Sequence, residues 1–517
     1  MRTPPSATNS HCLDLIIIGG GVNGAGIARD AAGRGLKTAL IEQADLAAAT
    51  SSASTKLIHG GLRYLELFEF RLVREALIER ERLLAIAPHI IHPMQFVLPH
   101  LAGVRPRWQI RAGLFLYDRL GGRKRLPASR PVRLTAERYG PLRPGLEHGF
   151  AYADCCVDDS RLVVLNALDA AERGAAIHTR VRFLSARVEN GLWVAQCVSR
   201  RTGATFQLRG RALVNAAGPW VEQVLRSVSD MDVASQVRLV KGSHIVTPRL
   251  YRGDHAFMLQ NVDGRIVFTI PYERQFTLIG TTDIPFRGDP AQAHISPEEV
   301  AYLCETVNAY FTTSISPQDV RWSYAGVRPL LDDESAEASK VTRDYRLELD
   351  RRRDGPVILS VFGGKITTYR RLAETALRKL HPHAGGDERG WTDRRALPGG
   401  DLPGADFEAF LAQMRRRWAF LTPQDARRLA CAYGTRVERI LGSAQRPEDL
   451  GEQFGAGLTQ AEVEYLRANE WACSAEDILW RRTKLGLHMS AAERDRLRQA
   501  LGEGPEPQPL AHIGQPT

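Results

Sequence analysis

Three glycines and one glutamate near the start of the chain have the spacing of a dinucleotide-binding site. Gly19, Gly21 and Gly24 lie between an apolar run and a stretch with helical spacing, and Glu42 follows 18 residues after Gly24. Glycines in this arrangement permit a tight turn, close approach of the backbone to a pyrophosphate and close packing of helix on strand. The acidic residue accepts a hydrogen bond from a ribose hydroxyl, which argues against a 2′-phosphate. We therefore expect FAD or NAD here, and not NADP.

Two later turns bear on the choice between these cofactors. Residues 213–220 read LVNAAGPW, an apolar strand with a small-residue turn that is similar to the second nucleotide-contacting motif of two-domain flavoproteins. Residues 363–368 read GGKITT and open onto a run with helical spacing. A helix N-terminus there stabilises the negative charge that develops on a reduced flavin. Either segment could also be a structural turn, so FAD and NAD both stay open at this level.

The pattern around these residues predicts an α/β fold. The apolar run LDLIII at 13–18 is typical of a buried parallel strand, and residues 37–41 form the second strand of a βαβ unit. Residues 241–248 alternate like a strand, and 265–280 and 345–361 each have the pattern of a hairpin. We expect an antiparallel sheet inserted into a doubly wound domain.

A glycine- and proline-rich stretch at 381–404 marks a domain boundary. Beyond it, residues 407–441 and 460–501 carry apolar residues at helical spacing, which predicts an all-helical C-terminal domain. The expected division is a discontinuous nucleotide-binding domain at 1–90, 150–235 and 350–385, a substrate-binding cap at 91–149 and 236–349, and a helical domain at 390–517.

The composition is that of a globular protein with a basic balance. The 517 residues are 44% hydrophobic and 25% charged, which excludes a disordered or fibrous protein. The formal net charge is +10, and only eight of the 69 basic residues are lysine. Arginine excess can reflect genome composition, but the balance favours an anionic partner such as phosphate, nucleic acid or a lipid head group.

The cysteines and the hydropathy of the chain indicate its cellular compartment. The seven cysteines contain no C-x-x-C, so neither a disulfide framework nor a zinc site is expected, and a reducing compartment fits. No apolar run reaches the ~18 residues of a membrane span, and the first dozen residues lack the apolar core of a signal peptide. We expect a cytoplasmic protein, soluble or attached to a membrane surface, with no metal site.

Six segments carry a specific resemblance. They are TSSASTKLIHGGLRYLE at 50–66, KGSHIV at 241–246, GTTD at 280–283, YAGVRPL at 324–330, TRDY at 342–345 and SVFGGKITTYR at 360–370. With these segments the chain resembles the FAD-dependent glycerol-3-phosphate dehydrogenase family, and closely its aerobic, respiratory bacterial members. The similarity continues through LPGG at 397–400 and LWRRTKLG at 479–486 and covers essentially the whole chain. It implies a two-domain FAD-binding Rossmann-type flavoprotein with the inserted antiparallel sheet and the helical domain.

The resemblance implies noncovalent FAD. In some flavoproteins a histidine placed like His59 is a covalent attachment point, but the resembled enzymes hold FAD noncovalently, so His59 is assigned only to the surroundings of the cofactor. The expected cofactor contacts are Gly19, Gly21, Gly24, Glu42, Thr50, Ser51, Ser52, Lys56, His59, Gly60, Gly61, Ala217, Gly218, Gly363, Gly364, Lys365 and Thr367.

The implied reaction oxidises C2 of glycerol 3-phosphate to dihydroxyacetone phosphate. The substrate phosphate carries a charge near −2, which the forked guanidinium of arginine binds well. The positions that match the family's phosphate pocket are Arg63, Arg328 and Arg343, with Tyr64 as a further hydroxyl donor. Arg328 is also expected to stabilise alkoxide character at C2. Lys365 is expected beside the flavin pyrimidine edge or the substrate.

His244 is the expected catalytic base, because imidazole titrates near neutral pH whereas arginine does not. A single histidine in an alternating strand is more often a structural residue with a hydrogen-bonded ring. The match of KGSHIV to the family favours the catalytic interpretation.

A basic, aromatic segment indicates a membrane surface. Residues 105–125 carry seven cations and one anion, interleaved with Trp108, Leu114, Phe115, Leu116 and Tyr117. This is the composition of an interfacial amphipathic helix that faces anionic lipid. The alternative is a solvated face with its aromatic residues in the core. Arg415, Arg416 and Arg417, followed by a tryptophan, form a weaker candidate.

The resemblance implies that electrons pass to ubiquinone or a similar quinone at the inner face of the cytoplasmic membrane, and a homodimer is expected. A glycerol-3-phosphate oxidase that uses O₂ is the first alternative, since residues alone separate the two poorly. An amine or amino-acid oxidase would need a carboxylate clamp, for which three arginines are less suited. An FAD-containing tRNA-modifying or nucleic-acid-binding protein would explain the pI of about 9.4, but no nucleic-acid-binding motif is found.

Overall fold

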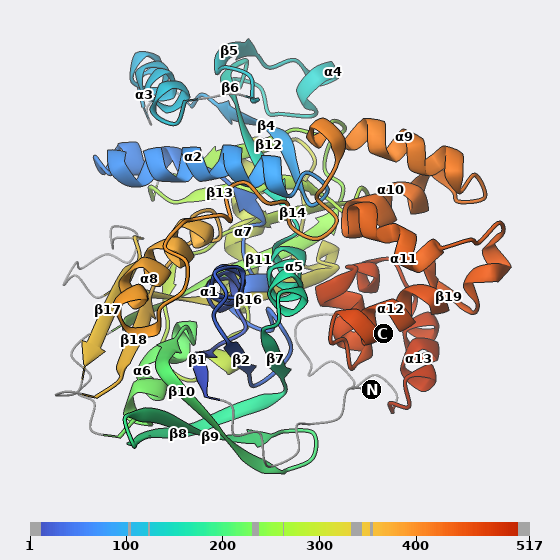
Figure 1. The fold of residues 1–517 in the computed structure, drawn as a ribbon. Helices are drawn as coiled ribbons and strands as arrows, with labels where there is room; N and C mark the ends of the chain where they lie inside the picture. Colours follow the sequence, from blue (N-terminus) through green and yellow to red (C-terminus); the bar gives the residue numbers. More distant parts are fainter. Residues whose placement is uncertain are drawn as a thin grey trace.

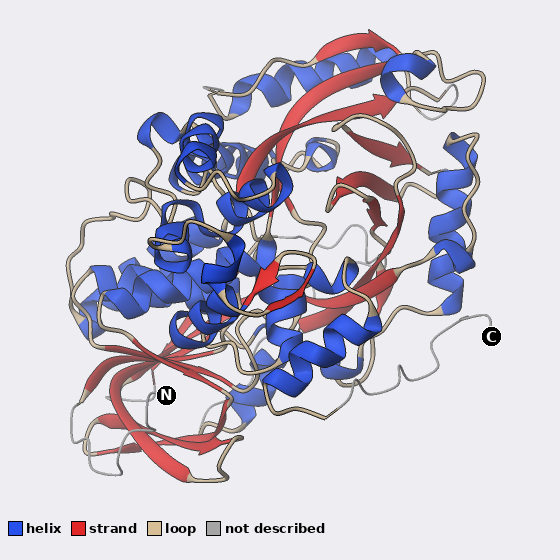
Figure 2. Cartoon of the chain, turned by 90° about the vertical axis from the view of Figure 1, so that its right-hand side faces the viewer, coloured by secondary structure: helices blue, strands red, loops and turns tan. Residues whose placement is uncertain are grey.

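Two β-sheets and a separate group of helices make up the chain in the computed structural model (Figure 1), which describes residues 12–101, 105–122, 125–229, 237–261, 263–331, 344–351 and 355–504. Figure 2 shows the two groups of strands with helices packed around and between them. No helix in these ranges is long and apolar enough to cross a membrane.

The first sheet contains the predicted nucleotide-binding strands. Its order is β17-β18-β10-β1-β2-β7, and β8 and β9 extend it from β10. The strands β18, β10, β1, β2 and β7 pair in parallel, while β17 is an antiparallel edge. The bounds are β1 Leu13–Ile18, β2 Thr38–Glu42, β7 Ala176–Thr179, β8 Val181–Glu189, β9 Leu192–Ser199, β10 Thr205–Asn215, β17 Arg346–Arg351 and β18 Val357–Phe362.

Alternate side chains of β1 enter two different cores, because successive residues of a strand point to opposite faces. Leu15 and Ile17 pack with the helices α1 (Val22–Gly33), α5 (Asp159–Glu172) and α8 (Tyr369–Ala384). Ile16 and Ile18 pack with α6 (Val221–Arg226) and with residues of β8 and β9. Burial on both faces explains why LDLIII is a continuous apolar run.

The second sheet is the predicted antiparallel insertion and has the order β15-β11-β14-β13-β12-β4-β6-β3, with β16 beside β11 and β5 beside β6. The predicted hairpin at 265–280 forms as β13 and β14. The bounds are β3 Leu57–Ile58, β4 Ile91–Pro99, β5 Arg130–Arg133, β6 His148–Val157, β11 Val237–Pro248, β12 Ala256–Gln260, β13 Ile266–Tyr272, β14 Phe276–Gly280, β15 Ile284–Pro285 and β16 Trp322–Leu331.

Two cores cover the faces of this second sheet. On one face, α7 (Pro297–Tyr310) packs against residues such as Val97 and Ile245. On the other, α2 (Phe70–Ile86) and α3 (Arg107–Leu120) pack against residues such as Phe96 and Val246. The short helix α4 spans Ala136–Tyr139.

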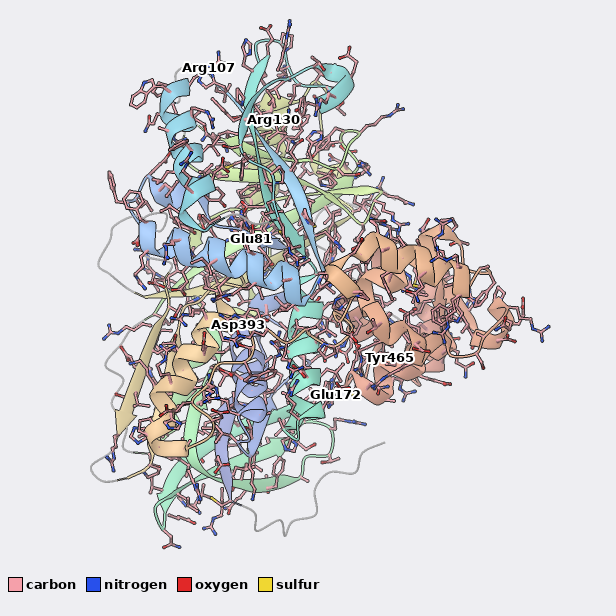
Figure 3. The ribbon with its side chains drawn as sticks, turned by 45° about the horizontal axis from the view of Figure 1, so that its top comes forward. Glu81, Arg107, Arg130, Glu172, Asp393 and Tyr465 are labelled. Carbon is pink, nitrogen blue, oxygen red and sulfur yellow. The ribbon has the colours of Figure 1, made fainter. Side chains whose placement is uncertain are left out.

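The C-terminal domain is helical, as predicted, with one small hairpin. It comprises α9 Phe407–Arg417, α10 Pro423–Tyr433, α11 Glu438–Leu441, β19 Gln453–Gly455, β20 Leu458–Thr459, α12 Gln460–Asn469, a π-helical turn at Asp477–Arg482, and α13 Ala491–Ala500. It has a core of its own. Figure 3 shows it to one side of the sheets, where Arg436 bonds both Glu172 of α5 and Tyr465 of α12, at 2.8 and 2.9 Å.

Two expected boundaries differ from the structure. Residues 150–157 were assigned to the nucleotide-binding domain, but they belong to β6, which pairs with β4 and β5 in the second sheet. The hairpin from residue 346 was divided at 349, yet the whole of β17 pairs with β18 in the first sheet. An apolar strand pattern predicts burial but does not specify the neighbouring strand, which is why these boundaries were misplaced.

Candidate active site

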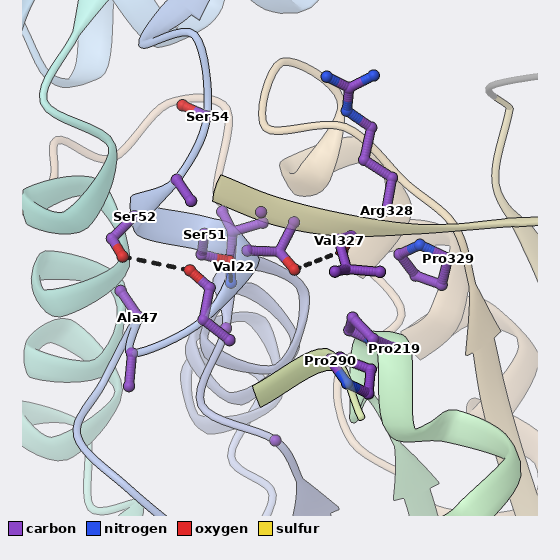
Figure 4. A pocket seen from close by; sticks show the side chains of 18 of the residues that line it. Val22, Ala47, Ser51, Ser52, Ser54, Pro219, Pro290, Val327, Arg328 and Pro329 are labelled. Atoms are coloured by element: carbon purple, nitrogen blue, oxygen red, sulfur yellow. Dashed lines mark hydrogen bonds between the residues drawn. The ribbon is translucent and has the colours of Figure 1, made fainter. Parts of the chain in front are cut away.

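One cavity of about 1660 Å³ lies where the two sheets and the helical domain meet. Its walls include Gly19 after β1, Arg328 on β16 and Trp480 in the helical domain. In Figure 4, Ser51 and Ser52 lie to one side of the cavity and Val327 and Arg328 to the other. Ligand sites usually measure about 300–1,000 Å³, so this cavity has room for a large cofactor and a small substrate together.

The glycine motif at the start of α1 is packed as a pyrophosphate site requires. Gly19 has φ +112°, and a Cβ there would lie 2.4 Å from the carbonyl oxygen of Ala216. A Cβ at Gly24 would lie 1.9 Å from the carbonyl oxygen of Gly19, which holds helix and turn close together. Gly19 and Gly21 line the cavity, whereas Gly24 is inside α1 and does not. The open N-terminus of α1 therefore faces space suited to a dinucleotide phosphate.

Glu42 ends β2 beside this turn and lines the cavity. Its Oε2 accepts from the Gly20 N–H at 2.7 Å, and its Oε1 accepts from the Ala44 N–H at 2.8 Å. Burial raises the pKa of this carboxyl, although both backbone donors oppose that shift. These two donors fix the carboxylate at the position expected for a ribose hydroxyl contact.

The segment 50–56 forms another wall. Thr50, Ser51 and Ser52 line the cavity, and Ser51 Oγ accepts from the Val22 N–H at 3.0 Å at the start of α1. Lys56 does not line it: its side chain is buried, with Nζ 2.8 Å from Asp159 Oδ1. Lys56 is therefore not among the lining residues, because its ammonium group pairs with the buried Asp159, and the expected contact with the cofactor stays a prediction.

In the histidine–glycine turn, too, some of the expected residues line the cavity and one does not. His59 and Gly61 line the cavity, but Gly60 does not. The Gly60 N–H donates to the Tyr117 hydroxyl at 2.8 Å, and a Cβ there would lie 2.5 Å from the Leu77 side chain. Gly60 therefore serves close packing behind the cavity wall and not the expected cofactor contact.

The two later turns reach the same cavity from β10 and β18, which run parallel to β1 on the side away from β2. Ala217 and Gly218 follow β10, and Gly363 and Gly364 follow β18. All of the residues expected there line the cavity: Ala217, Gly218, Gly363, Gly364, Lys365 and Thr367. The glycine cradle, the Glu42 carboxylate and these turns together fit FAD.

Several cationic side chains line the cavity. Arg63, Arg328 and Lys365 line it together with Tyr64. The guanidinium of Arg328 forms an ion pair with Asp283 and donates to Thr281 Oγ1 at 3.1 Å, and Nζ of Lys365 lies 3.9 Å from the centre of the Tyr64 ring. Arg63 forms no ion pair within the described part of the chain. Arg343, the third arginine expected at the phosphate, lies outside the described residues.

His244, the expected base, is on β11 and does not line the cavity. Its ring is buried, stacks on Tyr324 at 4.8 Å, and places Nε2 3.0 Å from Thr55 Oγ1. Burial lowers its pKa well below 6.5, and the charges of Arg328 and Lys56 act in the same direction. Thr55 and Tyr324, which contact this ring, both line the cavity, whereas His244 does not. The expected role of His244 as the base stays a prediction.

His59 is instead the histidine that faces the site. Among the described residues, no other histidine lines the cavity. Burial lowers its pKa below 6.5; Lys365 and Arg80 lower it further, and Asp154 opposes them. Its neutral imidazole is therefore available as a proton acceptor at neutral pH.

Several functional residues had been matched by motif but given no role. Asp283, in the GTTD segment, fixes Arg328 at the cavity. Trp480 and Arg481, in the LWRRTKLG segment, line the cavity together with Glu476 and Arg498. Their sequence distance from the glycine motif gave no indication that the helical domain borders the nucleotide site.

The basic segment 105–125 forms α3 over residues 107–120, as predicted. Ile110, Leu114 and Tyr117 are buried in the second-sheet core, whereas Trp108 is 74% and Phe115 49% exposed. Arg107, Arg111 and Arg119 are exposed on the same helix, and Figure 3 shows Arg107 at its outer end. Leu67 and Phe68, in the neighbouring turn before α2, and Phe70, the first residue of α2, are exposed as well. The exposed residues of this group are called the α3 patch below: Leu67, Phe68, Phe70, Arg107, Trp108, Arg111, Phe115 and Arg119.

Comparison with known proteins agrees with the site geometry. A family model described as "FAD dependent oxidoreductase" matches residues 14–370, and one described as "C-terminal domain of alpha-glycerophosphate oxidase" matches residues 391–502. The solved structure of a glycerol-3-phosphate dehydrogenase from Bacillus halodurans complexed with FAD is similar, with a TM-score of 0.74 and 27% identity over 95% of this chain and 94% of that one.

Three relatives are similar over nearly their full length. A glycerol-3-phosphate dehydrogenase of Pseudomonas aeruginosa is 54% identical over 98% of both chains. The aerobic glycerol-3-phosphate dehydrogenase of Escherichia coli is 50% identical over 95% of this chain and 97% of its own, and a D-erythritol 1-phosphate dehydrogenase of Brucella abortus is 51% identical over 93% and 96%. With its FAD cavity and these relatives, the chain belongs to the FAD-dependent glycerol-3-phosphate dehydrogenase family.

Proposed function

We propose that this enzyme oxidises sn-glycerol 3-phosphate to dihydroxyacetone phosphate with noncovalent FAD and passes the electrons to a membrane quinone. The observation that supports the proposal is that Arg63, Arg328 and Lys365 line the FAD cavity together with Tyr64 and His59. A small dianionic substrate matches this concentration of positive charge.

The cationic side chains are proposed to bind different parts of the substrate. Arg63 has its guanidinium unpaired within the described residues, so it is available for a phosphate. Arg343 is proposed as the second phosphate ligand from its motif. Arg328 is held by Asp283 and Thr281, which leaves it suited to orienting the C2 oxygen and stabilising alkoxide character.

His59 is the proposed base, with His244 as the alternative. As a neutral imidazole lining the cavity, it takes the hydroxyl proton at C2. Bound FAD supplies the acceptor for the hydride from C2. Burial is the main cause of the lowered pKa of His59, and the charge of Lys365, which also lies over the Tyr64 ring, acts in the same direction and contributes to anion binding.

A longer polyol phosphate is the second candidate substrate. The relative named D-erythritol 1-phosphate dehydrogenase is as similar to this chain as the aerobic glycerol-3-phosphate dehydrogenase is. Both substrates present a phosphate and a secondary hydroxyl, so the cationic residues that line the cavity serve either one.

The α3 patch is the proposed attachment to the inner face of the cytoplasmic membrane. Trp108, Phe115 and Phe68 are apolar and exposed, and the arginines of α3 surround them. This combination suits an interfacial helix on anionic lipid, where a quinone acceptor is reached. The homodimer expected from the sequence stays a prediction.

Anaerobic mixing tests the proposal. Glycerol 3-phosphate should bleach the flavin absorbance within milliseconds to seconds, glycerol should not, and a short-chain quinone should then restore the oxidised spectrum faster than O₂. Erythritol phosphates run in parallel decide between the substrates by their kcat/KM. No bleaching by any polyol phosphate would refute the function, and faster reoxidation by O₂ would make the enzyme an oxidase.

A further inference from the structure

A buried cluster of two lysines and two aspartates lies behind the segment that lines the FAD cavity. The four residues are Lys56, Asp158, Asp159 and Lys484, called the lysine–aspartate cluster below. The side chains of Lys56, Asp159 and Lys484 are 5%, 0% and 2% exposed, and that of Asp158 is 29% exposed. Two of the chain's eight lysines are therefore used at one interior site, although arginine is its ordinary cation.

One half of the cluster holds the cavity wall directly. Nζ of Lys56 lies 2.8 Å from Asp159 Oδ1 and donates to the Ser52 carbonyl oxygen at 3.0 Å. Asp159 Oδ2 also accepts from the Ser54 hydroxyl at 2.7 Å. Ser52 and Ser54 both line the cavity, so this ion pair fixes the wall from behind.

The other half comes from the helical domain. Lys484 follows the π-helical turn and has a left-handed backbone with φ +61°. Its Nζ donates to the Ser160 hydroxyl at 2.5 Å and lies 3.5 Å from Asp158 Oδ1. Asp158 caps the N-terminus of α5, and Asp159 and Ser160 are the next residues. Lys484 thus contacts the same helix end that anchors Lys56.

The segment 51–55, which this cluster holds, also contacts residues of the second sheet beside the cavity. The Tyr324 hydroxyl donates to the Ser54 carbonyl oxygen at 2.8 Å, and Thr55 Oγ1 contacts His244 Nε2 at 3.0 Å. Tyr324 lies on β16, the strand that also carries Arg328. A shift of α5 or of Lys56 therefore moves the segment 51–55, which is also hydrogen-bonded to Tyr324 and His244 of the second sheet.

The four groups together are electrically neutral. Without Lys484, one buried ammonium faces two carboxylates, and an uncompensated buried charge is strongly unfavourable. A lysine suits the site because its ammonium is a compact point charge, whereas the broad planar guanidinium of arginine would need more space. The helical domain also binds the loop after β2, where Arg481 and Arg482 approach Asp45 Oδ2 at 2.7 and 2.8 Å.

We propose that Lys484 is a positioning residue for FAD: through the N-terminus of α5, it keeps the cavity-lining segment 51–55 in its cofactor-binding conformation. The helical domain then completes the cofactor site and does more than cover it.

The test uses the full-length protein with Lys484→Met, which keeps the length of the side chain and removes its charge. Apoprotein is titrated with FAD and the quenching of flavin fluorescence gives Kd; visible circular dichroism of the saturated protein reports the flavin environment. We expect Kd to rise 10- to 100-fold and the visible spectrum to change. The control is Lys379→Met, an exposed lysine on α8, which should leave both unchanged.

A second variant separates positioning from loss of folding. Lys484→Met/Asp158→Asn removes one charge of each sign, so the cluster stays balanced and the protein should fold even if the single variant does not. Its Kd for FAD should lie between those of the wild type and the single variant. Wild-type Kd and an unchanged visible spectrum in the single variant, or in the double variant where the single one does not fold, would overturn the proposal whatever the melting temperature.

Discussion

His59 faces the cavity with its pKa lowered by burial, so the neutral imidazole persists below pH 6.5. Replacing it by asparagine should slow flavin reduction by about 10²- to 10⁴-fold, the range for a lost general base. Single-turnover mixing with substrate at pH 7 measures this effect. The comparison variant is His244→Asn; a loss as large as that of His59→Asn would return the role of base to His244.

The pH dependence of flavin reduction follows from the direction in which the pKa of His59 is shifted. A lowered pKa keeps the accepting form of His59 populated as pH falls, and activity is lost only where the ring becomes protonated. The acid limb of the flavin-reduction profile should therefore lie below pH 6.5 in the wild type. His59→Asn should remove that limb, and a profile with its acid midpoint above 6.5 would contradict the assignment.

Arg63 should determine substrate affinity more than the chemical step. Arg63→Gln keeps a polar side chain of similar length but removes the charge that a phosphate dianion requires, so KM should rise at least 30-fold while FAD stays bound. Arg415→Gln, an exposed arginine of the helical domain, is the matched control. An unchanged KM for Arg63→Gln would move the phosphate elsewhere in the cavity.

Most of the predicted site residues line the cavity, because their chemistry is local: Gly19 and Gly21 owe their position to one turn. His244, Lys56 and Gly60 show the limit of that approach. Each belongs to a matched motif, yet tertiary partners turn it from the cavity, as Asp159 does for Lys56. A motif specifies which residues lie close to a site; long-range packing decides which side chains point into it.

At the scale of an element, the basic surface of α3 can be compared with the basic surface of α9. Arg107, Arg111 and Arg119 replaced together by glutamine should weaken binding to vesicles of anionic lipid by about 100-fold, because each surface cation contributes about 1 kcal/mol. The same change at Arg415, Arg416 and Arg417 removes an equal charge and should have little effect. Co-sedimentation measures both triple variants; equal losses would mean that charge alone, and not the α3 patch, drives binding.

The elements themselves were largely predictable. The apolar periodicities gave β1, the β13–β14 hairpin and α3, since burial of one or both faces leaves a direct record in the sequence. Sheet membership was less predictable: β6 lies between β4 and β3 although α5, which follows it, packs on the first sheet. Pairing depends on contacts remote in sequence, which periodicity does not contain.

At the scale of the whole molecule, buried ion pairs join the helical domain to the first sheet. Asp477 is buried; although burial alone would raise its pKa, Arg481 and Arg180 lower it to about 2, below its ordinary 3.8. Because the folded pKa is lower, this pairing stabilises the protein above pH 4, and the contribution of about 2 kcal/mol is lost as pH falls from about 4 to 2. Urea unfolding across this range measures the loss.

Asp477→Asn should be less stable than the wild type at pH 6, and its free energy of unfolding should vary less between pH 4 and 2. Asp254→Asn is the control, because the Asp254 side chain is 97% exposed and pairs only at the surface. Parallel pH curves for wild type and Asp477→Asn would show that this carboxylate does not couple folding to pH.

The position of the cavity at the meeting of both sheets and the helical domain also governs biosynthesis. Its walls include residues from Ile18 to Arg498, so nearly the whole polypeptide must leave the ribosome before they are all present. Completion of the flavin site then follows synthesis of the helical domain, and nascent chains stalled before residue 476 would lack the part of the cavity wall that this domain supplies. Cells short of riboflavin would accumulate complete but colourless chains, whose survival depends on how long the quality-control proteases leave them intact.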